Sequence, residues 1–216
     1  MDDAPRRSLL HRYGPAARWY DVLSMEPLLY RGGRLAAIDA LRIQQGERVL
    51  DVGTGTGLSL PFLADAVGAG GEVVGLDPSP QMLAQARARV GASAWGDRVR
   101  LVTGSGSTPP ADLGGEFDVV LFAYSLGVMG GWQQAWDEAI SRVRPGGRVG
   151  VLDTGWPAGS WRLLTPAVAG VFALGGVHPA REVWAYAART LDNPVSRTFK
   201  GGHVHFTVGS VRTPAT

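Results

Sequence analysis

The sequence contains no cysteine among its 216 residues. Disulfide bonds, thiolate nucleophiles and cysteine-ligated zinc or iron–sulfur centres are therefore excluded. The absence is typical of proteins in a reducing compartment, and we expect a cytoplasmic protein. Residues 1–8 are acidic and then basic, with no apolar segment behind them, so we also expect no secretory signal.

An excess of one charge and a long apolar run are also missing. The chain has 21 Lys and Arg against 19 Asp and Glu, whereas nucleic-acid binding normally requires a concentrated basic surface. We therefore expect no nucleic-acid partner. The most apolar stretch, residues 163–177, is short and contains proline and glycine, while a membrane helix needs about 20 apolar residues. We expect no transmembrane segment and leave peripheral contact with a membrane open.

From residue 48 onward, short β-branched runs alternate with helical patterns. Strands are predicted at 48–52, 72–77, 99–103, 117–123, 148–153, 195–199 and 203–208, and helices at 58–67, 79–90, 132–143 and 180–191. This alternation favours βαβ units and a parallel sheet covered on both faces. We expect one α/β domain with a doubly wound, seven-stranded sheet, mostly parallel with an antiparallel last strand.

Four regions are expected within this single domain of residues 1–216. Residues 1–45 are predicted to form a helical N-terminal cover, with helices at 15–23 and 28–41, and residues 46–153 the cofactor-binding core. Residues 154–180 are the candidate lid, because connections of this length usually close over a site. Residues 181–216 complete the chain with a helix and a strand pair.

A glycine-rich turn follows the first predicted strand, with Gly53, Gly55 and Gly57 alternating with threonine. Glycines allow positive φ angles and a close approach of ligand to backbone, and the next helix offers unpaired N–H groups. Leu58 stands where a dinucleotide site has its third glycine, and no Lys-Ser/Thr pair follows as in a P-loop. The pattern therefore weakens the nicotinamide interpretation.

Asp77 ends the second predicted strand, about 20 residues beyond this turn. A doubly wound sheet places an acidic residue there against ribose hydroxyls, and a carboxylate accepts charge-assisted hydrogen bonds from both. The alternative is that Asp77 caps the next helix. Ser79 suits that cap better, because Pro80 then occupies the first helical position.

Four segments together resemble motifs of class I S-adenosylmethionine-dependent methyltransferases. They are residues 49–57, 73–79, 117–120 and 143–147, in the usual order and spacing. The upstream Arg18-Trp19-Tyr20-Asp21 resembles an element of the ubiquinone/menaquinone-type and phospholipid-type branch. The resemblance implies a Rossmann-like fold and S-adenosyl-L-methionine as the cofactor.

The resemblance also implies a set of cofactor-binding residues, grouped by the part of the cofactor that each would contact. They are Gly53, Thr54, Gly55 and Thr56 under the methionine part, with Asp51 orienting that loop; Asp77 at the ribose; Pro78 and Met82 beside the adenosine; Ser105 and Gly106 at the adenine, with Ser107 sharing the task; and Tyr124, Ser125 and Leu126 at the sulfonium end, with Tyr20 closing over it. Ser105 departs from the acidic or Asn residue usual in the family.

Methyl transfer from a sulfonium needs mainly alignment and exclusion of water, so no catalytic triad is expected. A base is required only where the acceptor must lose a proton, and the catalytic residue stays unknown, with His178 as a candidate. His203 and His205 share a strand face by spacing, and we interpret them as surface residues rather than a metal site. Trp156 and Trp161 are candidates for the acceptor pocket, with simple lid packing as the alternative.

These observations predict transfer of the methyl group of S-adenosylmethionine to a small, lipophilic acceptor: a quinone precursor, a lipid head group or a natural product. C-, O- and N-methylation are not distinguished, nor is the oligomeric state. Two alternatives stay open: an NAD(P)-dependent Rossmann oxidoreductase and a non-catalytic cofactor-binding module. A nucleic-acid methyltransferase is disfavoured, because residues 123–126 lack the Asn/Asp-Pro-Pro-aromatic motif.

Overall fold

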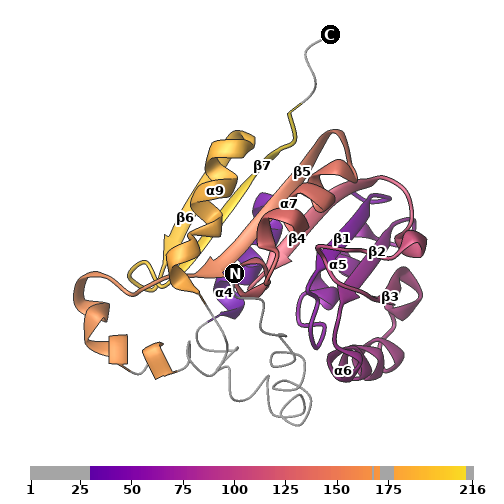
Figure 1. Cartoon of the computed structure of the whole chain (residues 1–216). Helices are drawn as coiled ribbons and strands as arrows, with labels where there is room; N and C mark the ends of the chain where they lie inside the picture. The colour runs from indigo at the N-terminus through magenta and orange to yellow at the C-terminus, as the bar shows by residue number, and fades with distance from the viewer. Residues whose placement is uncertain (1–29, 167, 171–177, 213–216) are drawn as a thin grey trace, which may run out of the picture.

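A seven-stranded sheet forms the centre of the computed structural model, which describes residues 30–166, 168–170 and 178–212 (Figure 1). The strands are β1 (Arg48–Val52), β2 (Glu72–Asp77), β3 (Val99–Thr103), β4 (Phe117–Ala123), β5 (Val143–Thr154), β6 (Asp192–Phe199) and β7 (Val204–Ser210). Their order is β3-β2-β1-β4-β5-β7-β6. Strands β1 to β5 pair in parallel, and β7 is antiparallel to both β5 and β6. The predicted α/β class, strand number and antiparallel last strand are confirmed.

Helices cover both faces of the sheet. The α-helices are α4 (Arg31–Ala40), α5 (Leu60–Val67), α6 (Pro80–Gly91), α7 (Trp132–Ser141) and α9 (Val183–Thr190), and the 3-10 helices are η1 (Gly96–Arg98), η2 (Ala111–Leu113), η3 (Leu126–Val128), η4 (Gly159–Leu164) and η5 (Pro179–Arg181). In Figure 1, α7 and α9 lie in front of the sheet and α4 lies behind it. The predicted helix at 15–23 falls outside the described residues.

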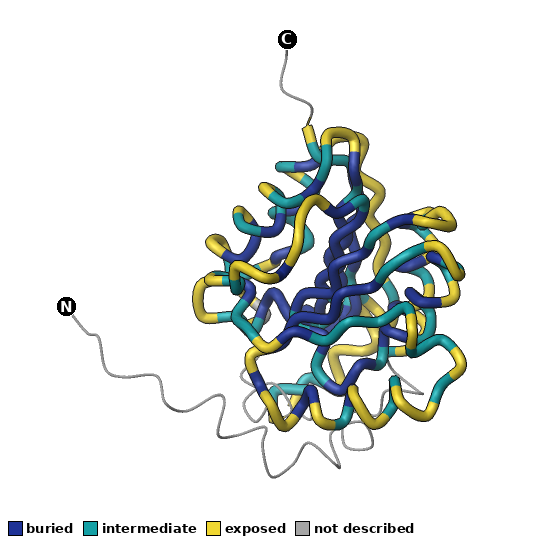
Figure 2. Tube along the Cα trace, turned by 90° about the vertical axis from the view of Figure 1, so that its right-hand side faces the viewer, coloured by how far each residue is buried: buried dark blue, intermediate teal, exposed yellow. Residues whose placement is uncertain are grey.

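The core consists of two apolar clusters, one on each face of the sheet. Leu50 and Phe122 belong to the cluster with α7 and α9, whereas Val49 and Leu121 belong to the cluster with α4 and α5. Successive side chains of a strand point to opposite faces, so neighbouring residues enter different clusters. Burial of both faces explains why these strands are almost continuously apolar, and Figure 2 shows the buried strands at the centre of the molecule.

Several predicted boundaries are wrong. Strand β5 begins at Val143 instead of residue 148, β6 at Asp192 instead of 195, and α9 at Val183 instead of 180. The helix after β1 begins at Leu60 instead of residue 58, because the N–H of Gly57 donates to the Thr54 carbonyl and prolongs the turn. The helix before β5 ends at Ser141, and Val143 starts the strand by pairing with Phe117. The ladder between β4 and β5 is irregular just beyond that pair.

Among the described residues, no helix combines the length and the apolar character needed to span a membrane.

Candidate functional site

The candidate site lies where the carboxyl ends of β1, β2 and β4 meet. Strand β1 pairs with β2 on one side and β4 on the other, so the strand order reverses here, and open α/β sheets bind ligands at such a point. The main-chain N–H groups of Gly53 and Thr54 donate to the Leu76 carbonyl over 2.7 and 3.0 Å. These bonds fix the glycine-rich turn against the end of β2.

The Asp77 carboxylate joins this turn to the start of α6. Its Oδ2 accepts from the Gly55 N–H at 2.9 Å and its Oδ1 accepts from the Ser79 N–H at 2.8 Å. Asp77 is 8% exposed, and burial raises its pKa while the two hydrogen bonds oppose the rise. A carboxylate has about four acceptor positions, so this group retains capacity for further donors. Ser79, as predicted, caps α6 by accepting from the Met82 N–H.

The glycines of the turn have different surroundings. Gly53 has a φ of +75°, and a Cβ built there would lie 2.5 Å from the Ser125 Cβ. Gly55 has a φ of +57°, and its Cβ would have no neighbour within 4 Å. Both need left-handed backbone, which favours glycine. Gly53 is thus required by packing within the protein, whereas Gly55 borders open space.

Asp51, near the end of β1, supports the glycine-rich turn that follows the strand. It is almost completely buried; its Oδ2 accepts from the Thr54 hydroxyl at 2.7 Å, and its Oδ1 has no partner among the described residues. Burial raises the pKa of Asp51 to about 6, although the Thr54 hydrogen bond and the charge of Arg34 both lower it. Thr56 is also buried. Sequence reasoning did not identify Arg34, which α4 brings here and which donates to the Ser59 hydroxyl at 2.7 Å.

The segment after β4 lies against the same turn. Tyr124 has a left-handed backbone with a φ of +58°, and its hydroxyl donates to the Tyr30 carbonyl at 3.0 Å. Non-glycine residues in this region are uncommon and concentrate at functional sites. The Ser125 hydroxyl donates to the Val52 carbonyl at 2.6 Å. The Leu126 side chain is fully buried in the core. Its contact with the cofactor stays a prediction, and main-chain atoms would have to make it.

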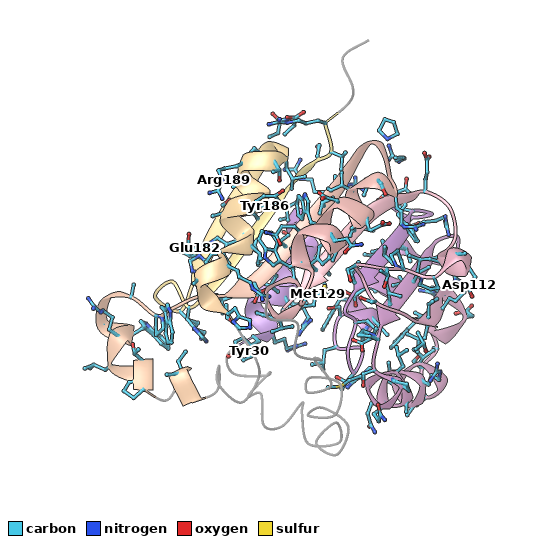
Figure 3. The ribbon with its side chains drawn as sticks, viewed as in Figure 1. Tyr30, Asp112, Met129, Glu182, Tyr186 and Arg189 are labelled. Carbon is cyan, nitrogen blue, oxygen red and sulfur yellow. The ribbon has the colours of Figure 1, made fainter. Side chains whose placement is uncertain are left out.

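The loop after β3 completes this side of the site. The hydroxyls of Ser105 and Ser107 lie 3.0 Å apart. Between them, Gly106 is buried: a Cβ there would be 2.9 Å from Val52 and 3.4 Å from the Met129 sulfur. The Met129 methyl group would be 3.1 Å from a Cβ on Gly53. Met129, which the sequence analysis missed, therefore packs between the loops that follow β1 and β3 (Figure 3).

The remaining predicted cofactor residues either lie next to Asp77 and in the first turn of α6 or fall outside the described residues. Pro78 is exposed next to Asp77, and Met82 is buried in the first turn of α6. Tyr20 and the Arg18–Asp21 element lie outside the described residues. The structure thus brings most of the predicted set to one edge of the sheet, and the contacts of each residue with a cofactor stay predictions.

A second buried acid, Asp153, links the ends of β4 and β5. Its Oδ2 accepts from the Gly127 N–H and its Oδ1 from the Thr154 N–H, both at 2.8 Å. Burial raises its pKa to about 6, although the charge of Arg181 lowers it. Arg181 donates to the carbonyls of Gly127 at 2.6 Å and Met129 at 2.7 Å. These groups are 26 to 54 residues apart in sequence, so no local spacing could have revealed them.

The two candidate acceptor-pocket tryptophans have different surroundings. Trp156 lines a pocket of about 230 Å³ near the end of β5. Trp161 packs on the turn between β6 and β7, where the Lys200 ammonium lies 5.9 Å from its ring centroid and a Cβ on Gly201 would be 2.5 Å from its ring. It does not line that pocket. His178 is exposed immediately before η5, and its role as a base stays a prediction.

The expectation for the other two histidines is wrong. His203 lies in the turn before β7 and is buried, with its Nδ1 2.9 Å from the Gly155 carbonyl and its ring against Tyr30. His205 lies within β7 and stacks on Trp184 of α9. The two rings therefore contact different helical layers instead of sharing one strand face. Among the described residues, no cluster of three or more His, Asp or Glu is placed to hold a metal ion.

Comparison with known proteins gives a consistent result. Residues 49–147 match the family of methyltransferase domains. The demethylmenaquinone methyltransferase of Shouchella clausii is 34% identical over 140 residues, covering 64% of this chain and 59% of that protein. The ubiquinone/menaquinone biosynthesis C-methyltransferase of Roseobacter denitrificans is 35% identical over 145 residues, covering 65% and 56%. The chain thus spans less than two thirds of the length of these relatives.

Solved structures share the fold. A SAM-dependent methyltransferase from Aquifex aeolicus superposes with a TM-score of 0.63 at 18% identity, covering 82% of this chain and 89% of that one. An identity this low shows a common fold alone. It confirms the predicted Rossmann-like arrangement of the sheet and its helices.

Proposed function

We propose that this chain, whose residues 49–147 match the family of methyltransferase domains, binds S-adenosylmethionine at the carboxyl edge of its sheet and transfers the methyl group to a small, lipophilic acceptor. The observation that carries the cofactor assignment is the Asp77 carboxylate. It is fixed by two main-chain N–H groups and retains acceptor capacity at the end of β2.

The residues around Asp77 fit the parts of such a cofactor. Two vicinal ribose hydroxyls match the remaining acceptor positions of Asp77. The open side of Gly55 gives the methionine part a backbone surface without a Cβ, and the hydroxyls of Ser105 and Ser107 offer polar partners for the adenine. A pyrophosphate instead needs the three-glycine fingerprint, and Leu58 interrupts it. The comparisons give the oxidoreductase alternative no support.

The bound cofactor supplies an activated methyl group, and the protein contributes alignment and exclusion of water. Tyr124 and Ser125 are held at the end of β4 by hydrogen bonds to Tyr30 and Val52. Their backbone is therefore fixed beside the turn at Gly53 before any ligand arrives. A fixed wall of this kind restricts the direction from which an acceptor approaches the methyl group.

We propose a quinone precursor as the acceptor to test first. The support is the resemblance to proteins named for methylation of demethylmenaquinone and for ubiquinone/menaquinone biosynthesis. A lipid head group and a natural product stay as further acceptors, and His178 as the candidate base. We also keep three further expectations as proposals: the chain is cytoplasmic, residues 154–180 form a lid, and the chain has no nucleic-acid partner.

Calorimetric titration tests the cofactor proposal. S-adenosylhomocysteine should bind the full chain with one site, and NAD⁺ and NADP⁺ should not. Binding of a nicotinamide nucleotide alone would contradict the proposal. Incubation with S-adenosylmethionine and a prenylated naphthoquinol, followed by mass spectrometry, should give a methylated product. Binding without turnover of any quinol, amine or phenol offered would support the non-catalytic alternative.

A further inference from the structure

A pocket of about 230 Å³ lies at the end of β5, apart from the predicted cofactor residues. Its lining comes from the segment after β5, the start of α9, and the β6–β7 turn with the first residues of β7: Gly155, Trp156, Ala158, Glu182, Trp184, Gly202 and His205. Strand β5 is the neighbour of β4 in the sheet and is separated from β2, which carries Asp77, by β1 and β4. None of the residues that line the pocket belongs to the predicted cofactor set.

Among the described residues that line this pocket, Glu182 is the only Asp, Glu, Lys or Arg. It is exposed, and among the described residues no arginine or lysine forms an ion pair with it. The neighbouring Arg181 is turned toward the carbonyls of Gly127 and Met129. Burial lowers the pKa of His205 below its ordinary value, which disfavours a positive charge on its ring, although the charge of Glu182 opposes this shift. The lining thus offers a carboxyl group and contains no Lys or Arg.

Aromatic rings form much of the remaining wall. The rings of Trp184 and His205 are stacked, with centroids 4.1 Å apart and planes 7° from parallel. The Trp156 side chain is 47% exposed. Indole is the best of the natural rings for attracting an organic cation, because its π-face is electron-rich. A carboxylate among indole rings is the arrangement that suits an ammonium group.

The backbone holds Glu182 in an unusual conformation. Its φ of +41° and ψ of +49° are left-handed, immediately before the first residue of α9. A non-glycine residue there is disfavoured, and such strain concentrates at functional positions. The Glu182 carbonyl accepts from the N–H groups of Ala185 and Tyr186, and the adjacent Val183 is buried. Figure 3 shows Glu182 at this end of α9.

We propose that the pocket formed by Trp156, Glu182, Trp184 and His205 binds an organic ammonium group. The carboxylate supplies the charge, and the indole rings supply a surface that a hydrated metal ion or an anion would not use. The ammonium group belongs either to a free amine or to the head group of a lipid. The pocket contains none of the predicted cofactor residues, so its test does not rest on cofactor binding, and Trp156 is the one residue that it shares with the acceptor-pocket candidates.

Choline and its uncharged analogue 3,3-dimethylbutan-1-ol test the site on the full chain. Indole N–H signals followed by NMR should shift with choline and stay unchanged with the alcohol, which has the same shape without the charge. Vesicles of phosphatidylcholine distinguish the two sources: sedimentation of the chain with them assigns a lipid head group, and its absence together with choline binding assigns a free amine. Equal shifts with choline and the alcohol, or none with choline and no sedimentation, would overturn the proposal.

Two variants locate the binding. Glu182→Gln removes the charge with little change of shape and should weaken choline binding by about tenfold or more. Trp156→Leu, at an exposed position, should weaken it as well. Glu116→Gln is the matched control, because Glu116 is exposed just before the amino end of β4, whereas the pocket lies beyond the carboxyl end of the parallel neighbour β5. All three variants should bind S-adenosylhomocysteine as the parent chain does. Choline binding that survives Glu182→Gln unchanged would overturn the assignment.

Discussion

The Asp77 carboxylate accepts a hydrogen bond from the main-chain N–H of Gly55, 2.9 Å away, and this bond joins the end of β2 to the turn after β1. One carboxylate thereby orders the loop and faces the ligand side of the sheet. The loop and the proposed ligand therefore bind to the same carboxylate. Changes at Asp77 should therefore affect both the order of the turn and the affinity for cofactor.

Asp77→Asn should weaken binding of S-adenosylhomocysteine by about 1.5–3 kcal/mol, the range for hydrogen bonds to charged groups. The amide nitrogen cannot accept from Ser79 or from a ribose hydroxyl, so at least one bond is lost. Calorimetry on the folded variant gives the difference. Asp112→Asn is the control, because Asp112 is exposed in η2. An unchanged dissociation constant for Asp77→Asn would contradict the ribose role.

The two glycines should respond differently to alanine. In Gly53→Ala the new Cβ meets Ser125 in left-handed backbone, so the free energy of unfolding should fall by about 2–4 kcal/mol. Gly55→Ala adds strain without a clash and should cost about 1–2 kcal/mol. Chemical denaturation measures both.

Cofactor affinity separates the same two variants further. The methyl group of Gly55→Ala projects into the open side of the turn, so the affinity for S-adenosylhomocysteine should fall by about tenfold or more although the fold is kept. If this variant binds like the parent chain, the cofactor does not occupy that side of the turn.

Asp51 should make stability depend on pH. Its pKa is about 6 in the folded chain against an ordinary 3.8, so the folded state holds this proton over a range where the unfolded state releases it. Stability from this group is therefore lost as the pH rises from about 4 to 6, by about 3 kcal/mol in total.

Asp51→Asn removes this titration. The free energy of unfolding of the variant relative to the parent should rise between pH 4 and 6 and stay level above, as urea denaturation at each pH would show. Asp39→Asn, at an exposed position on α4, is the matched control for the change of charge. A stability difference between Asp51→Asn and the parent that does not change between pH 4 and 6 would show that the Asp51 carboxyl is not buried as described.

Arg181 should hold the segment after β4 in place. Arg181→Gln removes the charged donor to the Gly127 and Met129 carbonyls, and hydrogen exchange of amides 126–129 should become faster by an amount equal to about 1.5–3 kcal/mol. Asp153 should also titrate at a higher pH, because the Arg181 charge lowers its pKa. Arg189→Gln, exposed on α9, should leave both unchanged; equal exchange in the two variants would contradict this role.

The sequence predicted the strands well because each pattern is local. A buried apolar run that is followed by glycine, such as Val49–Val52, shows where a strand ends. The candidate ribose role of Asp77 was predicted from its distance in sequence to the glycine-rich turn. The helix before β5 was extended too far, because the pairing of Val143 with Phe117 is a contact between segments 26 residues apart. Local periodicity carries no information about it.

Site residues that depend on long-range contacts were missed for the same reason. The charge of Arg34, from a helix that precedes β1, lowers the pKa of Asp51, and Arg181 donates to the Met129 carbonyl from 52 residues away. The histidine error has a related cause: residues 203 and 205 share a face only if both lie in the strand, and β7 begins at Val204. Glu182 gave no signal in sequence, because its left-handed backbone becomes visible only in the structure.

A crystal structure of the full chain with S-adenosylhomocysteine is the decisive measurement for the cofactor site. We expect the nucleoside across the ends of β1, β2 and β4, with both ribose hydroxyls on the Asp77 carboxylate and the amino-acid part over Gly55. A nucleoside bound elsewhere, or a ribose that makes no contact with Asp77, would contradict it.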